Sequence, residues 1–168
     1  MKLMNQTNTN IKKITILAIW TAISFVLGRI FTFPIPGSAG NILTLLDVGI
    51  YSAVFLLGKR EAAVIGGLSA FLLDFTAGYS NYMFFSLIIH GSQGYLAGLT
   101  RFKTLNFILS AIVMVGGYFI VGGFMYGWGS SIAGLWVNIV QVAIGFILAR
   151  VVSPLIKKAG ILNGFRKA

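Results

Sequence analysis

Two pairs of polar side chains stand inside stretches of the chain that are otherwise apolar. His90 and Gln93 are three residues apart, as are Asn138 and Gln141, so each pair shares one face of a helix. Such groups are costly in an apolar segment unless they bind each other or a ligand. They suit hydrogen bonds to a small, uncharged heterocycle, and hydrogen bonds between helices are the alternative interpretation.

The chain has few groups with which to transform a substrate. It contains one His, three acidic residues and no Cys, which excludes disulfides and zinc–thiolate sites. The stretch Gly58-Lys59-Arg60 lacks the earlier Gly and the following Ser or Thr of a phosphate-binding loop, so we do not expect the chain to hydrolyse ATP. The stretch Gly129-Ser130-Ser131 lacks the Gly that follows the serine of an intramembrane protease. We therefore expect no enzymatic activity, no cofactor and no metal site.

The elements that position these groups follow from composition. The 168 residues are 57% hydrophobic and 10% charged, which leaves too little polar surface to coat a water-soluble domain. A membrane-spanning helix needs about 20 mostly apolar residues, so the chain has room for six helices and no separate soluble domain. We predict an all-α integral membrane protein with one domain over 1–168 and six transmembrane helices near residues 14–31, 42–58, 62–77, 82–99, 105–126 and 131–155.

The basic residues indicate how such a bundle lies in the membrane. If six helices alternate in direction, 12 of the 13 basic residues lie on the same side of the membrane as the two termini, and Arg29 alone lies toward the other side. The positive-inside rule then places both termini in the cytoplasm. The net charge of +10 is spread over connections and termini and forms no single face, so we expect no nucleic-acid partner.

Three charged residues lie near the predicted outer ends of the helices. Arg29 and Asp47 are interpreted as a structural ion pair near the interface. Asp74 precedes the connection 78–82, which could roof a cavity formed by the polar pairs. His90, Tyr118 and Asn138 lie roughly 10 to 12 Å below the outer helix ends, at 1.5 Å per residue. The polar groups are therefore concentrated toward the outside.

Aromatic residues gather at the same end, and most are expected to anchor the protein at the level of the lipid headgroups. They are Tyr79, Tyr82, Phe84, Phe85, Tyr118, Tyr126, Trp128 and Trp136. A minority could stack on a flat ring. The connection 32–41 has a Pro-rich half and a Gly-rich half, and it is either a lid over an outer pocket or a simple connector.

Small residues repeat at intervals of four, which brings helices close together in membranes. Such stripes occur at Ala63-x-x-x-Gly67, Gly66-x-x-x-Ala70 and Gly94-x-x-x-Gly98, where internal packing is the expected use. A further stripe, Ala18-x-x-x-Ala22, is the candidate docking face for a partner. A chain of 18.1 kDa with no energy source of its own needs a partner to drive uphill transport.

From residue 11 to 158 the sequence resembles the substrate-binding S components of energy-coupling-factor (ECF) vitamin transporters. The motifs that carry the resemblance are Ala18-x-x-x-Ala22, the runs 40–47, 57–63 and 87–94, and Asp74-x-x-x-Gly78-Tyr79-x-x-Tyr82. Within that family it is similar to the riboflavin, hydroxymethylpyrimidine and pyridoxine branch, with a lean toward hydroxymethylpyrimidine. Related sequences commonly have Lys and Glu where this chain has His90 and Gln93.

The resemblance implies that the protein captures a vitamin or vitamin precursor outside the plasma membrane. It then tips against a transmembrane coupling subunit driven by two cytoplasmic ATPases. A stand-alone facilitator and a structural or assembly protein of the membrane are the alternatives. The predicted substrate-binding residues are Asp74, Tyr79, Tyr82, His90, Gln93, Tyr118, Asn138 and Gln141.

Overall fold

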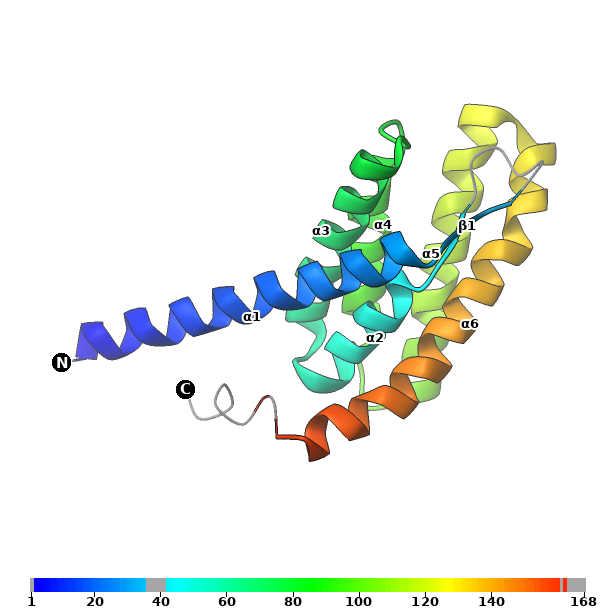
Figure 1. Cartoon of the computed structure of the whole chain (residues 1–168). Coiled ribbons are helices and arrows are strands. Elements are labelled where there is room, and N and C mark those ends of the chain that lie inside the picture. Colours follow the sequence, from blue (N-terminus) through cyan, green and yellow to red (C-terminus); the bar gives the residue numbers. More distant parts are fainter. Residues whose placement is uncertain (1, 36–41, 161, 163–168) are drawn as a thin grey trace.

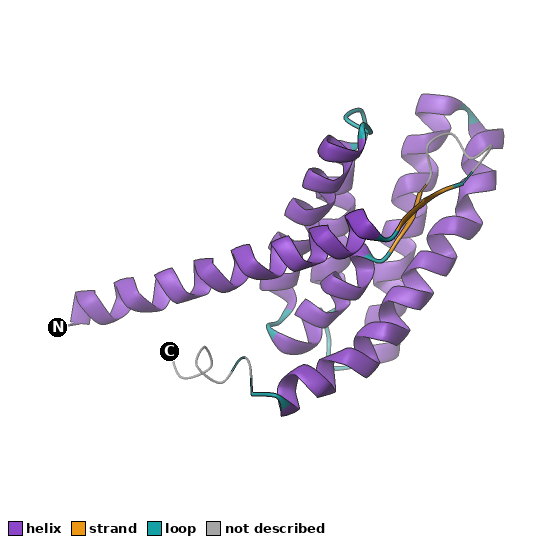
Figure 2. Ribbon diagram, in the orientation of Figure 1, coloured by secondary structure: helices purple, strands orange, loops and turns teal. Residues whose placement is uncertain are grey.

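The structure is a computed structural model that describes residues 2–35, 42–160 and 162, with side chains from residue 10 onward. Within these residues the fold is helical apart from two short strands (Figures 1 and 2). The helices are α1 (Lys2–Ile30), α2 (Leu46–Leu56), α3 (Lys59–Ala77), α4 (Met83–Leu96), α5 (Lys103–Tyr126) and α6 (Trp128–Lys158). The prediction of six helices is confirmed for the described residues.

The second helix begins later than the sequence indicated. A helix was predicted from residue 42, but Ile42–Thr44 form strand β2, which pairs antiparallel with β1 (Thr32–Pro34). The Oγ1 of Thr44 accepts a hydrogen bond from Leu46 N, so Thr44 satisfies a backbone donor at the start of α2. Residues 36–41 of the expected lid-like loop lie outside the described residues.

The short helix α2 is the centre of the bundle, with α1, α3 and α6 packed around it. Leu46, Ile50 and Tyr51 are almost completely buried there. Two glycines permit the close packing. A Cβ atom on Gly49 would collide with Ser24 of α1, and one on Gly145 of α6 would collide with Asp47. The carboxylate of Asp47 is thereby held inside the protein.

The outward faces of the bundle are apolar. Phe124 is 79% exposed and Trp136 is 73% exposed, and many Ile, Leu and Val side chains point outward with them. A water-soluble monomer rarely exposes so much contiguous apolar surface. Three helical stretches are long and apolar enough on their own to cross a membrane, namely Asn10–Ile30, Lys103–Tyr126 and Trp128–Lys158.

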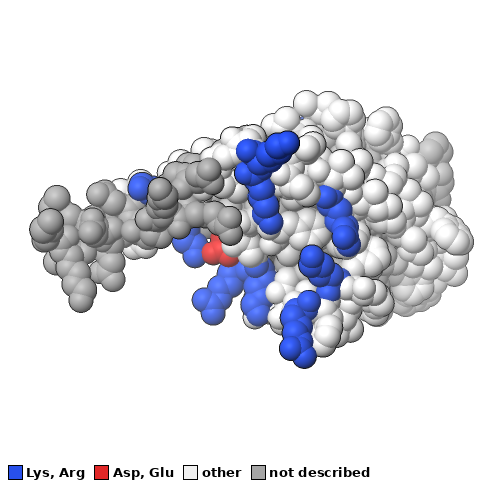
Figure 3. All heavy atoms as spheres, turned by 90° about the horizontal axis from the view of Figure 1, so that it is seen from below, with Lys and Arg blue, Asp and Glu red and all other residues white. Residues whose placement is uncertain are grey.

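Most of the basic residues gather at one end of the bundle. Lys and Arg lie there in the middle of α1, in the first turn of α3, in the α4–α5 connection, at the start of α5 and in the last turns of α6, and Figure 3 shows this end of the molecule from below. Lys13 Nζ makes an ion pair of 2.8 Å with Glu61 Oε1 and so joins α1 to the first turn of α3. The other end of the bundle, where α3 ends and α6 begins, holds the candidate site.

Candidate functional site

A cavity opens between β2, the end of α3, the start of α4 and the facing turns of α5 and α6. It holds about 470 Å³ of space not filled by atoms, including the part open to the outside. Little of this space is wide enough for a water molecule, so the cavity is narrow. It is lined by Ile42, Thr44, Leu46, Ala70, Leu73, Asp74, Tyr79, Tyr82, His90, Met114, Tyr118, Asn138 and Gln141.

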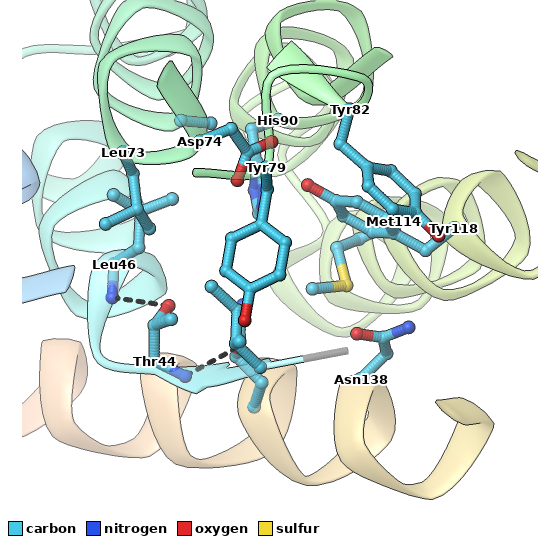
Figure 4. A pocket seen from close by; sticks show the side chains of 13 residues that line it. Thr44, Leu46, Leu73, Asp74, Tyr79, Tyr82, His90, Met114, Tyr118 and Asn138 are labelled. Atoms are coloured by element: carbon cyan, nitrogen blue, oxygen red, sulfur yellow. Dashed lines mark hydrogen bonds between the residues drawn. The ribbon is translucent and has the colours of Figure 1, made fainter. Parts of the chain in front are cut away.

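The cavity brings together most of the residues that the sequence singled out as substrate-binding. Figure 4 shows Asp74, Tyr79 and Tyr82 on one side and Asn138 of α6 on the opposite side. Of the eight predicted residues, the one that does not line the cavity is Gln93. Its role as a substrate contact stays a prediction.

His90 and Gln93 point from α4 into the interior because α4 lies very close to α3. A Cβ atom on Gly66 of α3 would come within 2.6 Å of the backbone oxygen of His90. His90 itself is only 2% exposed. Its Nδ1 lies 2.6 Å from Oε1 of Gln93.

Gln93 leads away from the cavity into the apolar core. Its Nε2 donates to the hydroxyl of Tyr51 at 3.3 Å, and that hydroxyl lies 2.9 Å from Oγ of Ser110. Ser110 Oγ in turn donates to the backbone oxygen of Phe107 at 2.8 Å. These hydrogen bonds join α2, α4 and α5, so for Gln93 the interhelical interpretation describes the geometry.

The expected ion pair between Arg29 and Asp47 is wrong. Among the described residues Arg29 is exposed near the end of α1, and Asp47 is completely buried. The ionisable side chain beside Asp47 is instead His90, whose Nδ1 lies 3.5 Å from Oδ1. Because α2 begins only at Leu46, Asp47 occupies its first turn and faces the bundle interior.

Asp74 and its neighbours form the wall at the outer end. Gly78 adopts φ +86°, which ends α3 and lets the backbone N–H of Tyr79 return to the Asp74 carbonyl at 2.9 Å. Within the described part of the chain, the Oδ2 atom of Asp74 is buried and has no hydrogen-bond partner. A buried acceptor of this kind is available to a ligand.

Two tyrosines form an aromatic surface beside His90. The rings of Tyr82 and Tyr118 are 6.1 Å apart, and the Tyr118 ring is 5.6 Å from the imidazole. The hydroxyl of Tyr118 is held by Ser86 Oγ at 2.6 Å. By contrast, Trp128 and Trp136 are exposed on the outside of the bundle, as expected for headgroup anchors.

Helix α6 supplies the amides of the opposite wall. Oε1 of Gln141 accepts the backbone N–H of Thr44 at 2.8 Å, so its Nε2 is the group left to donate elsewhere. Asn138 is buried and makes no hydrogen bond within the described residues. Its side chain can therefore both donate to and accept from a ligand.

Sequence reasoning missed the apolar part of the wall, which consists of Ile42, Leu46, Ala70, Leu73 and Met114. These residues look like any others in an apolar helix, and their types alone carry no signal. Thr44 was also missed as a site residue, because its contact with Gln141 joins residues 97 positions apart.

Comparison with known proteins decides the family. Residues 8–158 match the family described as ECF-type riboflavin transporter, S component. The chain belongs to this family. It is 81% identical, over all 168 residues of both chains, to the thiamine precursor transporter HmpT of Lactococcus lactis subsp. cremoris strain MG1363. It is also 33% identical to an uncharacterized protein in a gap 3'region of Pyrococcus woesei, over 74% of this chain and 88% of that relative.

Membership in this S-component family has direct consequences. The protein is a membrane-embedded subunit of an ECF-type transporter that binds a vitamin-like substrate, and it is not an enzyme. The family therefore decides against the two alternatives, a stand-alone facilitator and a purely structural membrane protein. The cavity at the end opposite the basic residues is the candidate substrate site.

Proposed function

We propose that this S component binds a hydroxymethylpyrimidine-like aminopyrimidine, a precursor of thiamine, and delivers it for ATP-driven uptake. The relative that is 81% identical over its full length is named a thiamine precursor transporter, which supports this substrate class. The cavity supports it independently, since it is narrow and carries few charged groups. Riboflavin, with three fused rings and a ribityl chain, is much larger.

The polar groups of the cavity match an aminopyrimidine. Asp74 Oδ2 is an unpartnered acceptor for an amino or hydroxyl hydrogen. The Asn138 amide is a donor for a ring nitrogen, and Gln141 Nε2, which also lies near Asp47, is a second. The rings of Tyr82 and Tyr118 offer flat apolar surface for the heterocycle. The observation that supports this proposal best is a narrow cavity with apolar walls and a few buried polar groups that are available to a ligand.

Calorimetric titration of the purified full chain tests the substrate. Hydroxymethylpyrimidine should bind tightly, and riboflavin should bind far more weakly. Asn138→Leu should weaken hydroxymethylpyrimidine binding by about 10- to 100-fold, because a hydrogen bond lost in a dry pocket costs about 1 to 3 kcal/mol. Asn81→Ala, whose partner Tyr126 is exposed, is the matched control and should bind normally. Tighter binding of riboflavin than of hydroxymethylpyrimidine would contradict the proposal.

We further propose that all six helices cross the plasma membrane and that both termini are cytoplasmic. The concentration of Lys and Arg at one end of the bundle supports this orientation (Figure 3). Single cysteines at Ser80 and Gly129 should react with an impermeant reagent from outside, and cysteines at Arg60 and Lys103 only from the cytoplasm. Labelling of the Gly129 position from the cytoplasm would contradict the orientation.

The docking face for the ECF coupling subunit and its two ATPases is proposed to be the groove between α1 and α3. Ala18 and Ala22 are exposed in this groove, which holds about 860 Å³ of space not filled by atoms, including the part open to the outside. Leu17, Phe25 and Leu68 form part of its apolar walls. A helix of the coupling subunit could settle closely on the two alanines, because they present no bulk.

A further inference from the structure

A continuous chain of hydrogen bonds leads from the substrate cavity to a backbone carbonyl in the core. It runs from His90 Nδ1 to Gln93, from Gln93 to Tyr51, from Tyr51 to Ser110, and from Ser110 to the oxygen of Phe107. The four heavy-atom distances lie between 2.6 and 3.3 Å. All four side chains that make these hydrogen bonds are buried. Tyr51 belongs to α2, His90 and Gln93 to α4, and Ser110 to α5.

The carbonyl at the end of the chain sets the direction of every link. A carbonyl only accepts, so the single hydroxyl hydrogen of Ser110 points to Phe107. Ser110 must then accept from Tyr51, and the Tyr51 oxygen accepts from the amide nitrogen of Gln93. The amide oxygen of Gln93 therefore faces His90 and can only accept.

This direction places a hydrogen on Nδ1 of His90. The carboxylate oxygen Oδ1 of Asp47, 3.5 Å from the same nitrogen, favours that hydrogen as well. In a neutral imidazole the other nitrogen, Nε2, then carries a lone pair and no hydrogen. Nε2 has no hydrogen-bond partner among the described residues, and the ring is part of the cavity wall.

We propose that Gln93, Tyr51 and Ser110 are positioning residues that fix the tautomer of His90, so that Nε2 is an acceptor that selects ligands with a hydrogen-bond donor. Asp74 Oδ2, a second acceptor in the same cavity, has the same preference. The identity of the ligand rests on the proposed function. With an aminopyrimidine, the exocyclic amino group supplies the donor, and an oxo analogue would set one acceptor against another.

Nitrogen NMR of the histidine tests the tautomer directly. The sequence contains a single His, so a full-length protein labelled with ¹⁵N-histidine and purified without a histidine tag gives one imidazole. Before any ligand is added, Nδ1 should be protonated and Nε2 should not. A proton on Nε2, alone or together with one on Nδ1, would overturn the proposal.

Variants separate positioning from simple structural support. Gln93→Leu removes the acceptor, and Tyr51→Phe frees the Gln93 amide to rotate, so both should reduce the fraction of His90 protonated on Nδ1. Hydroxymethylpyrimidine affinity should fall with it by about 10- to 100-fold. Ser92→Ala, the neighbour of Gln93 that faces the outer groove between α3 and α4, is the control and should change neither quantity. An unchanged tautomer in folded Gln93→Leu or in folded Tyr51→Phe would overturn the proposal.

Ligand analogues separate this inference from the choice of substrate. The amino compound should bind at least about tenfold more tightly than the matching oxo compound, and this preference should shrink in Tyr51→Phe. If the Nδ1 tautomer is found but hydroxymethylpyrimidine does not bind, the proposed substrate fails and the tautomer stands. If hydroxymethylpyrimidine binds and the oxo analogue binds equally well, the acceptor role of Nε2 fails alone.

Discussion

Small residues serve opposite purposes at the contacts that α3 makes with α4 and with α1. Toward α4 the helix is closed, since a Cβ atom on Gly94 would come within 2.4 Å of the Ala62 backbone oxygen, and one on Gly67 within 2.8 Å of the Leu87 oxygen. Toward α1 it is open, with Ala18 and Ala22 exposed in a groove. The same spacing of small residues thus marks a filled contact on one face and an empty one on the other.

The two contacts differ because the chain itself supplies a helix to fill one of them and not the other. A short connection after Gly78 returns the chain directly alongside α3, so α4 fills the glycine face. On the other face, Val64, Leu68 and Leu72 form one wall of the groove and α1 forms the other. No further helix of the described chain covers this groove. A small-residue stripe therefore indicates close approach but not whether the approaching helix belongs to the same chain.

The largest expected effect is at the closed face. Gly94→Leu would force α3 and α4 apart, because the obstacle is backbone and cannot swing aside. We expect a loss of about 1 to 3 kcal/mol or more in the free energy of unfolding, measured by thermal or denaturant unfolding in detergent. Gly116→Ala on α5 is the control and should not destabilise the protein, because beyond the helix's own nearby backbone no atom of the described residues would come within 4 Å of the added Cβ. Equal stability of Gly94→Leu and the parent protein would refute the closed contact.

A smaller effect is expected at the basic end of the open face. Lys13 and Glu61 join α1 to α3 there with a partly exposed ion pair, so Glu61→Gln should cost about 0 to 1 kcal/mol of stability. Partial burial opposes ionisation of Glu61, but the hydrogen bond and charge of Lys13 outweigh it and lower the pKa below the ordinary value of 4.5. A lowered pKa stabilises the folded state above the unfolded pKa, and this contribution is lost as the pH falls through the folded pKa.

The pH dependence provides the measurement. The difference in unfolding free energy between the parent protein and Glu61→Gln should be present at neutral pH, and it should decline as the pH falls below 4.5 and through the lower pKa of the folded state. Added salt should also reduce it, because the pair is partly exposed. A difference that persists unchanged in acid would mean that Glu61 stabilises the protein by packing and not by charge.

The smallest effect on stability, and the one that most sharpens the comparison, is at Ala18 and Ala22. Replacement of either with Leu or Trp adds bulk to an open groove, so the unfolding free energy should change by no more than about 0.5 kcal/mol. Ligand affinity should also persist, since the cavity lies on other elements. Uptake in cells and copurification of the coupling subunit should both be lost. If the variants transport normally, the groove is not the docking face.

The helices and most of the cavity wall could be predicted because their signals are local. A polar side chain in an apolar helix, such as Asp74 or Asn138, must face the interior, whatever the rest of the fold does. Gln93 shows the limit of this reasoning. Residues three apart on a helix differ by about 60° in direction, and here that angle turns His90 to the cavity and Gln93 to Tyr51.

Features set by distant partners could not be predicted. The strand at Ile42–Thr44 depends on the Gln141 side chain, which accepts a backbone hydrogen bond that a helix would otherwise have satisfied. The Asp47–His90 contact depends in turn on where α2 begins and on the lack of a side chain at Gly145. Nothing near Asp47 in the sequence distinguishes a partner on α4 from Arg29 on α1.

The three tryptophans lie in two different environments, so their fluorescence can report on one part of the molecule. Trp20 is 7% exposed, packs against Ala53 and Ile65, and donates from Nε1 to the Gly49 oxygen at 3.0 Å, whereas Trp128 and Trp136 face outward at the other end. Replacement of the two outer residues with Phe leaves a single indole on the turn of α1 that backs the Ala18 groove. Its emission wavelength and its shielding from a water-soluble quencher would then follow the junction of α1, α2 and α3 during ATP-driven transport, without an attached dye.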